Sequence, residues 1–243
     1  MNASKRVDFI KNWITNYIQS MPKKASALVV GVSGGIDSAV VSTISSMTGL
    51  KTFVLSMPIK QIKTQDDLSK LHCKWLVSNF KNVSYLNVDL DNVFSSFENA
   101  LGENNSEHAF ANSRARLRMT TLYQVAGSNN GIVVGTGNKV EDFGVGFYTK
   151  YGDGGVDISP IADCTKSQVW EMGEFLEIDH KIISAPPTDG LWVDGRNDED
   201  QLGMTYKELE EAMENPKSEN YNKYLKIREN NLHKIKEIPV CKF

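Results

Sequence analysis

The string Gly31-Val32-Ser33-Gly34-Gly35-Ile36-Asp37-Ser38 decides the fold of this chain through what lies on either side of it. A short apolar run at 27–32 leads into the string, and an amphipathic segment at 38–47 follows it. Glycines let backbone N–H groups approach an anion closely, and a following helix directs its positive dipole end at the same point. The string therefore predicts a phosphate-binding turn between a strand and a helix, with added hydroxyl donors at Ser33 and Ser38.

Asp37 is the unusual residue of this string. A carboxylate at the rim of a phosphate site repels phosphate unless a cation lies between them, so Asp37 suggests Mg²⁺ bridging carboxylate and phosphate oxygens. The string is neither a Walker A loop, because the Gly-Lys-Ser/Thr ending is absent, nor a dinucleotide fingerprint, because its glycine spacing differs. A plain glycine-rich turn would explain the glycines but not the acid.

The alternation of segments predicts the fold class. Apolar, β-branched runs recur at 27–32, 52–55, 83–90 and 132–134, and amphipathic helical patterns lie at 7–18, 38–47, 66–80 and 112–126. This order favours a doubly wound α/β fold with a parallel sheet, in a single domain spanning residues 1–243. Further helices are expected at 166–176, 206–213 and 219–233. Between the helices expected at 166–176 and 206–213, residues 186–203 are expected to form either a loop that orders on ligand binding or an inert connector.

The composition excludes several classes of partner. The net charge is −3 and basic residues form no arm or polybasic patch, so neither nucleic acid nor a membrane surface is expected as a partner. The three cysteines, Cys73, Cys164 and Cys241, lack any C-x-x-C pair, which argues against a disulfide framework or zinc knuckle. With no targeting segment and no apolar stretch of membrane-spanning length, a cytoplasmic protein is expected.

A second constellation lies on the helix predicted at 112–126. Asn112, Arg116 and Tyr123 fall along one edge of its core-facing stripe, whereas Arg114 and Arg118 fall along the other. A guanidinium beside an aromatic ring suits the phosphates and rings of a dinucleotide, although solvated arginines beside a core helix are the simpler interpretation for the helix alone. The stripe itself consists of small and apolar residues: Ala115, Met119, Leu122 and Ala126.

The string Gly135-Thr136-Gly137-Asn138-Lys139-Val140-Glu141 follows the last predicted strand, where nucleotide-binding loops of open sheets lie. Thr136 and Glu141 could therefore join the site of the first loop. Glu141 is a candidate second Mg²⁺ ligand opposite Asp37, with Asp142 as its competitor and a surface acid as the alternative.

These motifs together resemble a known family. The S-G-G-x-D-S string is similar to the pyrophosphate loop of the N-type ATP pyrophosphatases. The arginine helix, G-T-x-x-x-x-E at 135–141, F-x-T-K-Y-G-D-G-G-x-D at 147–157, Thr165-Lys166 and P-T-D at 187–189 then follow in the order of the ammonia-dependent NAD synthetases. The resemblance implies an adenine-nucleotide alpha-hydrolase-like fold, a homodimer, ATP as co-substrate, Mg²⁺ as cofactor, and amidation of deamido-NAD (nicotinic acid adenine dinucleotide) with ammonia.

The resemblance also implies roles for individual residues. It assigns ATP binding to the loop and three later positions: Gly31, Val32, Ser33, Gly34, Gly35, Ile36, Asp37, Ser38, Thr136, Lys166 and Thr188. It assigns Mg²⁺ to Asp37 and Glu141. It assigns deamido-NAD to a set of residues in the second half of the chain: Arg116, Tyr123, Phe147, Lys150, Asp157, His233 and Lys234.

The implied reaction passes through an acyl-adenylate, with Lys166 stabilising charge on phosphate. Asp153 is the candidate to hold or deprotonate ammonium, with a purely turn-forming role as the alternative. The chain offers no room for a fused glutaminase domain, although a separate subunit could supply ammonia. An arginine that some members place near adenine is missing, and Lys60 or Lys63 could replace it. Rival interpretations are another adenylating ATP pyrophosphatase and a catalytically silent nucleotide-binding sensor.

Overall fold

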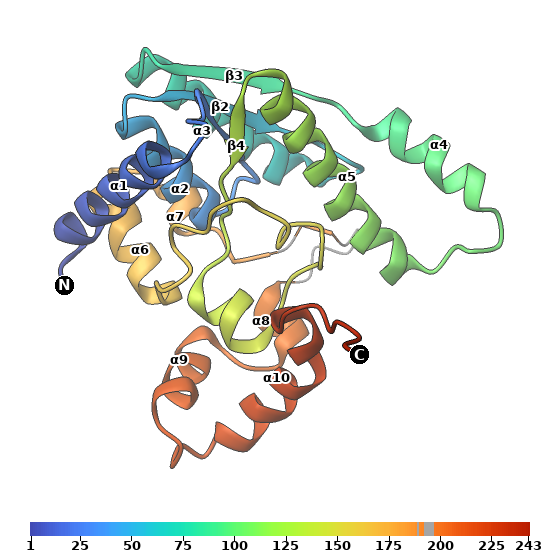
Figure 1. Ribbon diagram of the computed structural model, residues 1–243. Helices are drawn as coiled ribbons and strands as arrows, with labels where there is room; N and C mark the ends of the chain where they lie inside the picture. Colours follow the sequence, from blue (N-terminus) through green and yellow to red (C-terminus); the bar gives the residue numbers. More distant parts are fainter. Residues whose placement is uncertain (189, 192–196) are drawn as a thin grey trace.

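The computed structural model describes residues 1–188, 190–191 and 197–243 of the chain. Its sheet has four parallel strands in the order β3-β2-β1-β4 (Figure 1). The strands are β1 (Ala27–Gly31), β2 (Lys51–Ser56), β3 (Val83–Asn87) and β4 (Gly131–Val133). The predicted parallel α/β sheet is therefore confirmed, with β1 between β2 and β4.

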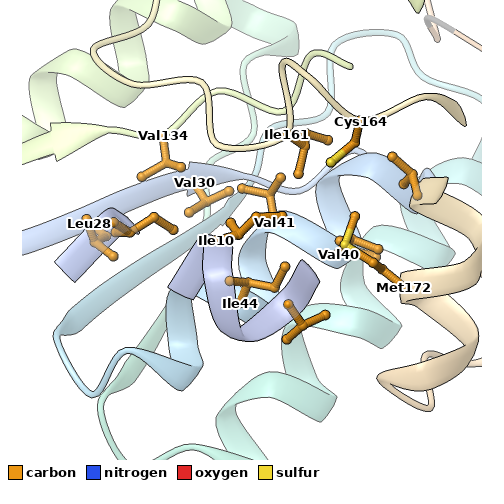
Figure 2. Close-up of a cluster of buried hydrophobic side chains, with 14 of the residues drawn as sticks. Ile10, Leu28, Val30, Val40, Val41, Ile44, Val134, Ile161, Cys164 and Met172 are labelled. Carbon is orange, nitrogen blue, oxygen red and sulfur yellow. The ribbon is translucent and has the colours of Figure 1, made fainter. Parts of the chain in front are cut away.

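Helices cover both faces of this sheet because successive strand residues point to opposite sides. Leu28 and Val30 of β1 belong to one buried cluster, and Val29 between them belongs to another. One face carries α1 (Ala3–Ser20), α2 (Ile36–Met47), α3 (Lys63–Asn79) and α6 (Lys166–Phe175). The other face carries α4 (Asp91–Leu101) and α5 (Glu107–Ser128). Figure 2 shows the first cluster, in which Ile10, Val30 and Val41 meet.

A smaller helical layer lies below the sheet in Figure 1. It contains the π-helix η1 (Lys139–Val145), α9 (Tyr206–Glu214) and α10 (Tyr221–Ile235), which share a separate buried cluster that includes Val140, Tyr206 and Tyr224. Two short helices, α7 (His180–Ile183) and α8 (Asp198–Leu202), complete the described elements. This layer places α9 against the loop that follows β4.

The structure departs from the sequence prediction at four places, the first of which is the short helix α7, which was not predicted. The helix α4 was also not predicted, although its apolar residues Val93, Phe97 and Leu101 recur at helical spacing, and only Phe94 of it is buried. The helix η1 was also not predicted, because a π-helix is a rare, short element with no hydrophobic period to read. The expected loop at 186–203 contains α8, and residues 189 and 192–196 of it lie outside the described residues.

The strand order determines where a ligand can bind. The chain leaves β1 toward β2 on one side, and β4 pairs with β1 on its other side. Open α/β sheets bind ligands at such a reversal, outside the carboxyl ends of the strands. The strings at 31–38 and 135–141 both follow strands at this point, so the fold brings them together.

All three cysteines are free thiols, and burial raises the pKa of Cys73 to about 12. Within the described part of the chain, no helix combines the length and apolarity needed to cross a membrane.

A buried histidine joins α2 to α3 and predicts a pH-dependent stability. The Nε2 atom of His72 lies 3.1 Å from the carbonyl oxygen of Ala39 and 3.1 Å from Ser42 Oγ, and burial lowers the pKa of His72 to about 4. Because the unfolded chain binds this proton more readily, stability is complete above the ordinary pKa of 6.5 and is lost as the pH falls toward 4. Lowering the pH from 7.5 to 5 is expected to cost about 2 kcal/mol of unfolding free energy through His72.

Urea unfolding at the two pH values measures this effect. His72→Gln is expected to be less stable at pH 7.5 but to lose that part of the pH dependence, whereas the exposed control His180→Gln keeps the wild-type slope. An unchanged pH slope in His72→Gln would contradict the assignment.

Candidate active site

A cavity of about 510 Å³ opens at the carboxyl ends of β1 and β4. Ligand sites for small molecules commonly have this size. Its walls come from the loop at 31–38, from 135–137 after β4, from α5, and from residues 185–188 and 190–191. Its lining includes all of the residues predicted to bind ATP or Mg²⁺ or to act in catalysis: the whole string from Gly31 to Ser38, Thr136, Glu141, Asp153, Lys166 and Thr188.

The loop at 31–38 is held in shape by its own serines. Ser38 Oγ donates to the carbonyl oxygen of Gly35 at 2.9 Å and accepts from the N–H of Ser33 at 3.1 Å. The N-cap of α2 is Gly35, which provides no side-chain acceptor for the first N–H groups of the helix. An uncapped helix start beside a cavity is suited to an anion. Ser38 therefore shapes the loop, and the backbone presents the donors.

Gly34 is the position of this loop that tolerates no side chain. Its φ is +95°, and a Cβ atom would lie 2.7 Å from the backbone oxygen of Gln65. Gly34→Ala is expected to raise the dissociation constant for ATP at least about tenfold, because a non-glycine residue in this conformation costs about 1–2 kcal/mol before the clash is counted. Calorimetric titration with ATP measures this change.

Gly49→Ala is the matched control. Gly49 also has a positive φ, +77°, but no atom lies within 4 Å of its added Cβ. This control carries the backbone strain without the clash and lies outside the loop, so ATP binding should be unchanged. Equal ATP affinity in both variants would contradict the role assigned to Gly34.

Two carboxylates and one lysine converge at the inner end of the cavity. Lys166 Nζ lies 2.6 Å from Asp37 Oδ2 and 2.9 Å from Glu141 Oε1. The side chain of Lys166 is only 2% exposed. The capping box formed by Thr165 and Gln168 sets the start of α6, which places Lys166 as its first residue. Three distant segments thus meet at one charged point.

Neighbouring polar groups orient both carboxylates. Asn138 Nδ2 donates to Asp37 Oδ1 at 2.9 Å, while Asn138 Oδ1 accepts from the backbone N–H groups at the start of η1. The hydroxyl of Tyr206 donates to Glu141 Oε1 at 2.5 Å. Burial raises the pKa of Tyr206, and the adjacent Glu141 and Asp198 raise it further, so this hydroxyl keeps its proton.

The charges of the three central groups follow from burial and from each other. Burial raises the pKa of Asp37, although Lys166 lowers it in part. Burial also opposes ionisation of Glu141, but the pKa of Glu141 is lowered because Lys166 and several hydrogen bonds outweigh that effect. The pKa of Lys166 is raised because the two carboxylates outweigh its burial. Lys166 is therefore a permanent cation.

The arrangement fits a divalent cation that is shared with a phosphate. Asp37 and Glu141 already converge on one cationic atom, as the oxygen ligands of Mg²⁺ would. Across residues 1–188, 190–191 and 197–243, no three His, Cys, Asp or Glu side chains are grouped so that they alone could hold a metal. Phosphate oxygens and water would have to complete the coordination, which is how Mg²⁺ commonly binds at nucleotide sites.

The chain is similar to known proteins of one family. The family model described as NAD synthase matches residues 6–240. The chain belongs to the NAD synthase family. A protein from Carboxydothermus hydrogenoformans described as NH(3)-dependent NAD(+) synthetase is 38% identical over 215 residues, which cover 86% of this chain and 85% of that protein. The family predicted from the order of the motifs is confirmed.

Solved structures of the family share the fold. The structure of NMN synthetase from Francisella tularensis has a TM-score of 0.90 and 30% identity, and the alignment covers 100% of both chains. An NH3-dependent NAD synthetase from Campylobacter jejuni has a TM-score of 0.79 at 24% identity, also over 100% of both chains. The latter likeness supports the predicted fold alone.

In this family member, the residues expected to contact deamido-NAD lie mostly outside the cavity wall. Only Phe147 of that set lines it. Arg116 Nε donates to the carbonyl oxygen of Lys150 at 3.2 Å, and Lys150 Nζ donates to that of His233 at 3.2 Å. Lys234 Nζ donates to the carbonyl oxygen of Tyr148 at 2.9 Å. Four of the predicted residues are thus brought together between α5, the segment at 146–157 and α10.

Tyr123 and Asp157 form a separate pair. The Tyr123 hydroxyl donates to Asp157 Oδ1 at 3.0 Å, and Asp157 Oδ2 accepts from the N–H of Val133 at 2.7 Å. Burial raises the pKa of Tyr123, and the adjacent Asp157 raises it further, to about 12. Through its hydrogen bond with Val133, Asp157 connects the glycine-rich segment to β4. A substrate contact by Tyr123 and Asp157 stays a prediction.

Two acids lie together on the wall of the cavity. Asp153 Oδ1 accepts from the N–H of Thr149 at 3.0 Å, which is the turn-forming role, yet Asp153 also lines the cavity. Asp142 lines it too, and burial together with Asp153 and Glu141 raises the pKa of Asp142 well above its ordinary value. Gly137 makes room for Asp142, because a Cβ there would lie 1.9 Å from Asp142 Oδ2.

The structure also identifies site residues that sequence reasoning missed. Arg118, assigned to the other edge of its helix, lines the cavity and donates from Nε to the carbonyl oxygen of Met57 at 3.0 Å. Lys60 pairs with Glu98, and neither Lys60 nor Lys63 lines the cavity. Arg118 is thus the arginine that lies beside the end of β2, but the helical pattern around it contained no signal for this position.

Proposed function

We propose that this chain is an ammonia-dependent NAD synthetase that converts deamido-NAD, ATP and ammonia into NAD, AMP and pyrophosphate. The observation that carries the proposal is the convergence of Asp37, Glu141 and Lys166 beside the phosphate loop, in a chain of the NAD synthase family. A nucleotide-binding sensor has no chemical need for two buried carboxylates and a buried lysine at one point.

The first step activates the acceptor. The nicotinate carboxylate attacks the α-phosphorus of ATP, and the bond to the β-phosphate breaks so that pyrophosphate leaves. The backbone of the loop at 31–38 would bind the departing phosphates, and Lys166 would stabilise charge on the α-phosphate. Asp37 and Glu141 would hold Mg²⁺, which supplies positive charge against the phosphates when it is bound.

The second step forms the amide. Ammonium first gives up a proton, and the resulting ammonia attacks the carbonyl carbon of the acyl-adenylate. The bond from that carbon to the bridging oxygen breaks, AMP leaves with this oxygen, and the nitrogen loses a second proton. Asp153 is our candidate to hold ammonium and accept its first proton, because it lies on the wall of the same cavity as the phosphate loop. Its hydrogen bond with Thr149 would fix the carboxylate rather than exclude it from this role.

We also infer that the chain forms a cytoplasmic homodimer. The apolar face of α1 packs into the core of its own chain, whereas Phe9, Trp13 and Tyr17 lie on its outer side with exposed fractions of 61%, 38% and 38%. Trp13 and Tyr17 are stacked with their ring centroids 5.8 Å apart. These three rings support the dimer proposal because aromatic residues are enriched at interfaces.

One observation favours a second candidate acceptor. The relative from Francisella tularensis, which is 30% identical and aligns over the whole of both chains, is described as an NMN synthetase. The acceptor could accordingly be nicotinate mononucleotide, which carries the same carboxylate on a smaller nucleotide.

The test is amide formation by the purified chain with ATP and Mg²⁺. Deamido-NAD and nicotinate mononucleotide are supplied in parallel, each with ammonium or with glutamine, while AMP and pyrophosphate are followed. NAD formed with ammonium but not glutamine is the expected result. Faster amidation of the mononucleotide would select the second candidate, and ATP binding without turnover would contradict both. Asp153→Asn, compared with the exposed control Asp163→Asn, tests the proton-accepting role.

A further inference from the structure

Tyr206 lies in the interior beside the proposed metal ligands although nothing in its local sequence suggests a catalytic position. It is the first residue of α9, and its side chain is among the largest that are fully buried. A capping box formed by Thr205 and Glu208 sets the start of the helix, and the N–H of Tyr206 donates to Glu199 Oε1 at 2.9 Å. The position of its ring is therefore determined by several contacts.

The ring is also fixed in orientation. It packs edge to face against Trp170 of α6, with the centroids 5.9 Å apart and an interplanar angle of 82°. Lys166 Nζ lies 4.8 Å from the centroid of Tyr206. Cation–π contacts of this kind attract a lysine to the ring face, most strongly when the pair is desolvated. Tyr206 thus contacts the lysine with its ring and the adjacent carboxylate with its hydroxyl.

The hydroxyl acts on one oxygen of Glu141. Lys166 Nζ, at 2.9 Å, and Tyr206 Oη, at 2.5 Å, both donate to Oε1. Two donors on one oxygen set the rotation of the carboxylate. Glu141 also lines the cavity, so the rotation of its carboxylate bears on how it would meet a cation shared with Asp37.

The same hydroxyl has a second carboxylate neighbour. Asp198 Oδ2 lies 3.1 Å from Tyr206 Oη, and the N–H of Asp198 donates to the carbonyl oxygen of Pro187 at 2.9 Å. Pro187 precedes Thr188, which lines the cavity. A phenol has a single proton, so it can donate to only one of the two carboxylates at a time. The shorter distance assigns that proton to Glu141.

We propose that Tyr206 is a positioning residue for metal binding: its hydroxyl holds Glu141 in the rotation that receives Mg²⁺ together with ATP. The inference deepens, and rests on, the proposed role of Glu141 as a metal ligand. Groups that orient metal ligands typically change metal affinity by about 10- to 100-fold when they are removed. Tyr206 would therefore act through Glu141 and not on the substrate itself.

The test separates metal binding from folding and turnover. Calorimetry measures the affinity of the full chain for α,β-methylene-ATP, which cannot be cleaved between its α- and β-phosphates, with Mg²⁺ and again with EDTA. The ratio of the two affinities is the metal-dependent gain. In Tyr206→Phe, which keeps the ring and its packing, this gain is expected to fall by about tenfold, while the affinity in EDTA stays at the wild-type value.

Two further variants make the result specific to the hydroxyl. Tyr224→Phe removes the hydroxyl of another buried tyrosine in the same cluster and should keep the full gain. Asp198→Asn removes the charge of the carboxylate that competes for the Tyr206 proton and leaves Glu141 as its only charged acceptor among these two, so the gain should also be kept. General disturbance of this buried region would lower the gain in Asp198→Asn as well, and that result overturns the inference even if Tyr206→Phe does not fold.

Glu141→Gln distinguishes the two levels of the proposal. Loss of the gain in Glu141→Gln with a wild-type gain in Tyr206→Phe would overturn the inference and leave the metal role standing. A wild-type gain in Glu141→Gln would overturn the metal role, and the inference with it. The expected result is that Glu141→Gln and Tyr206→Phe both lose the metal-dependent gain, while Tyr224→Phe and Asp198→Asn keep it.

Discussion

Lys166→Met is expected to lower the rate of amide formation at least about 10³-fold, because it removes the cation placed to stabilise phosphate charge in the transition state. The same change leaves Asp37 and Glu141 partly buried without their shared partner. Breaking a buried ion pair from one side costs about 3 kcal/mol or more. The variant is therefore expected to lose both activity and stability, as measured by product formation and by urea unfolding.

The stability loss in Lys166→Met should depend on pH in a defined direction. Without the lysine, burial raises the pKa values of both carboxyl groups above those of the unfolded chain, so protonation stabilises the folded state. The loss should accordingly shrink as the pH is lowered. Lys139→Met is the matched control, because Lys139 is an exposed lysine that pairs with Asp163. Activity within tenfold of wild type in Lys166→Met would contradict the role of this residue.

Asp37→Asn is the second variant with a large expected effect. An asparagine preserves the shape and can still accept the hydrogen bond from Asn138, but it lacks the charge that would hold Mg²⁺. Pyrophosphate release is expected to fall at least about 10³-fold, since several kcal/mol of charge stabilisation depend on the ion. Stability should change little, because Lys166 keeps its contact with Glu141.

The control for this variant is Asp163→Asn, whose side chain is 97% exposed. Activity is measured with saturating ATP over a range of Mg²⁺ concentrations. Near wild-type release of pyrophosphate by Asp37→Asn would show that Asp37 does not serve the metal. A defect that excess Mg²⁺ fully corrects would limit its role to binding the ion.

The phosphate loop shows what could be predicted from consecutive residues. Gly34 adopts a φ that side chains avoid, Gly35 leaves the start of α2 uncapped, and Asp37 lies in the first turn. Each of these properties belongs to one residue and its immediate neighbours. The strands and the main helices were predictable for the same reason, since their hydrophobic periods are local.

The order of the motifs carried the prediction further, because it identified a family whose members bring those motifs together. That route indicated Asp37, Glu141 and Lys166 as one site, and the structure places all three within hydrogen-bonding distance. It did not indicate which side chains would surround them. The helical period places Arg118 on the other edge of its helix, and none of the motifs includes Tyr206.

The sequence by itself determined the parallel α/β fold, the phosphate turn after β1 and the family, because these depend on local backbone chemistry, on periodicity and on motif order. Only the tertiary structure decided which charges share a cation and which groups hold them in place. Lys166 is 129 positions from Asp37, and Tyr206 is 65 positions from Glu141. Contacts between such distant residues arise where β4 joins β1 and the small helical layer closes over the loops, and no local pattern encodes the distances that result.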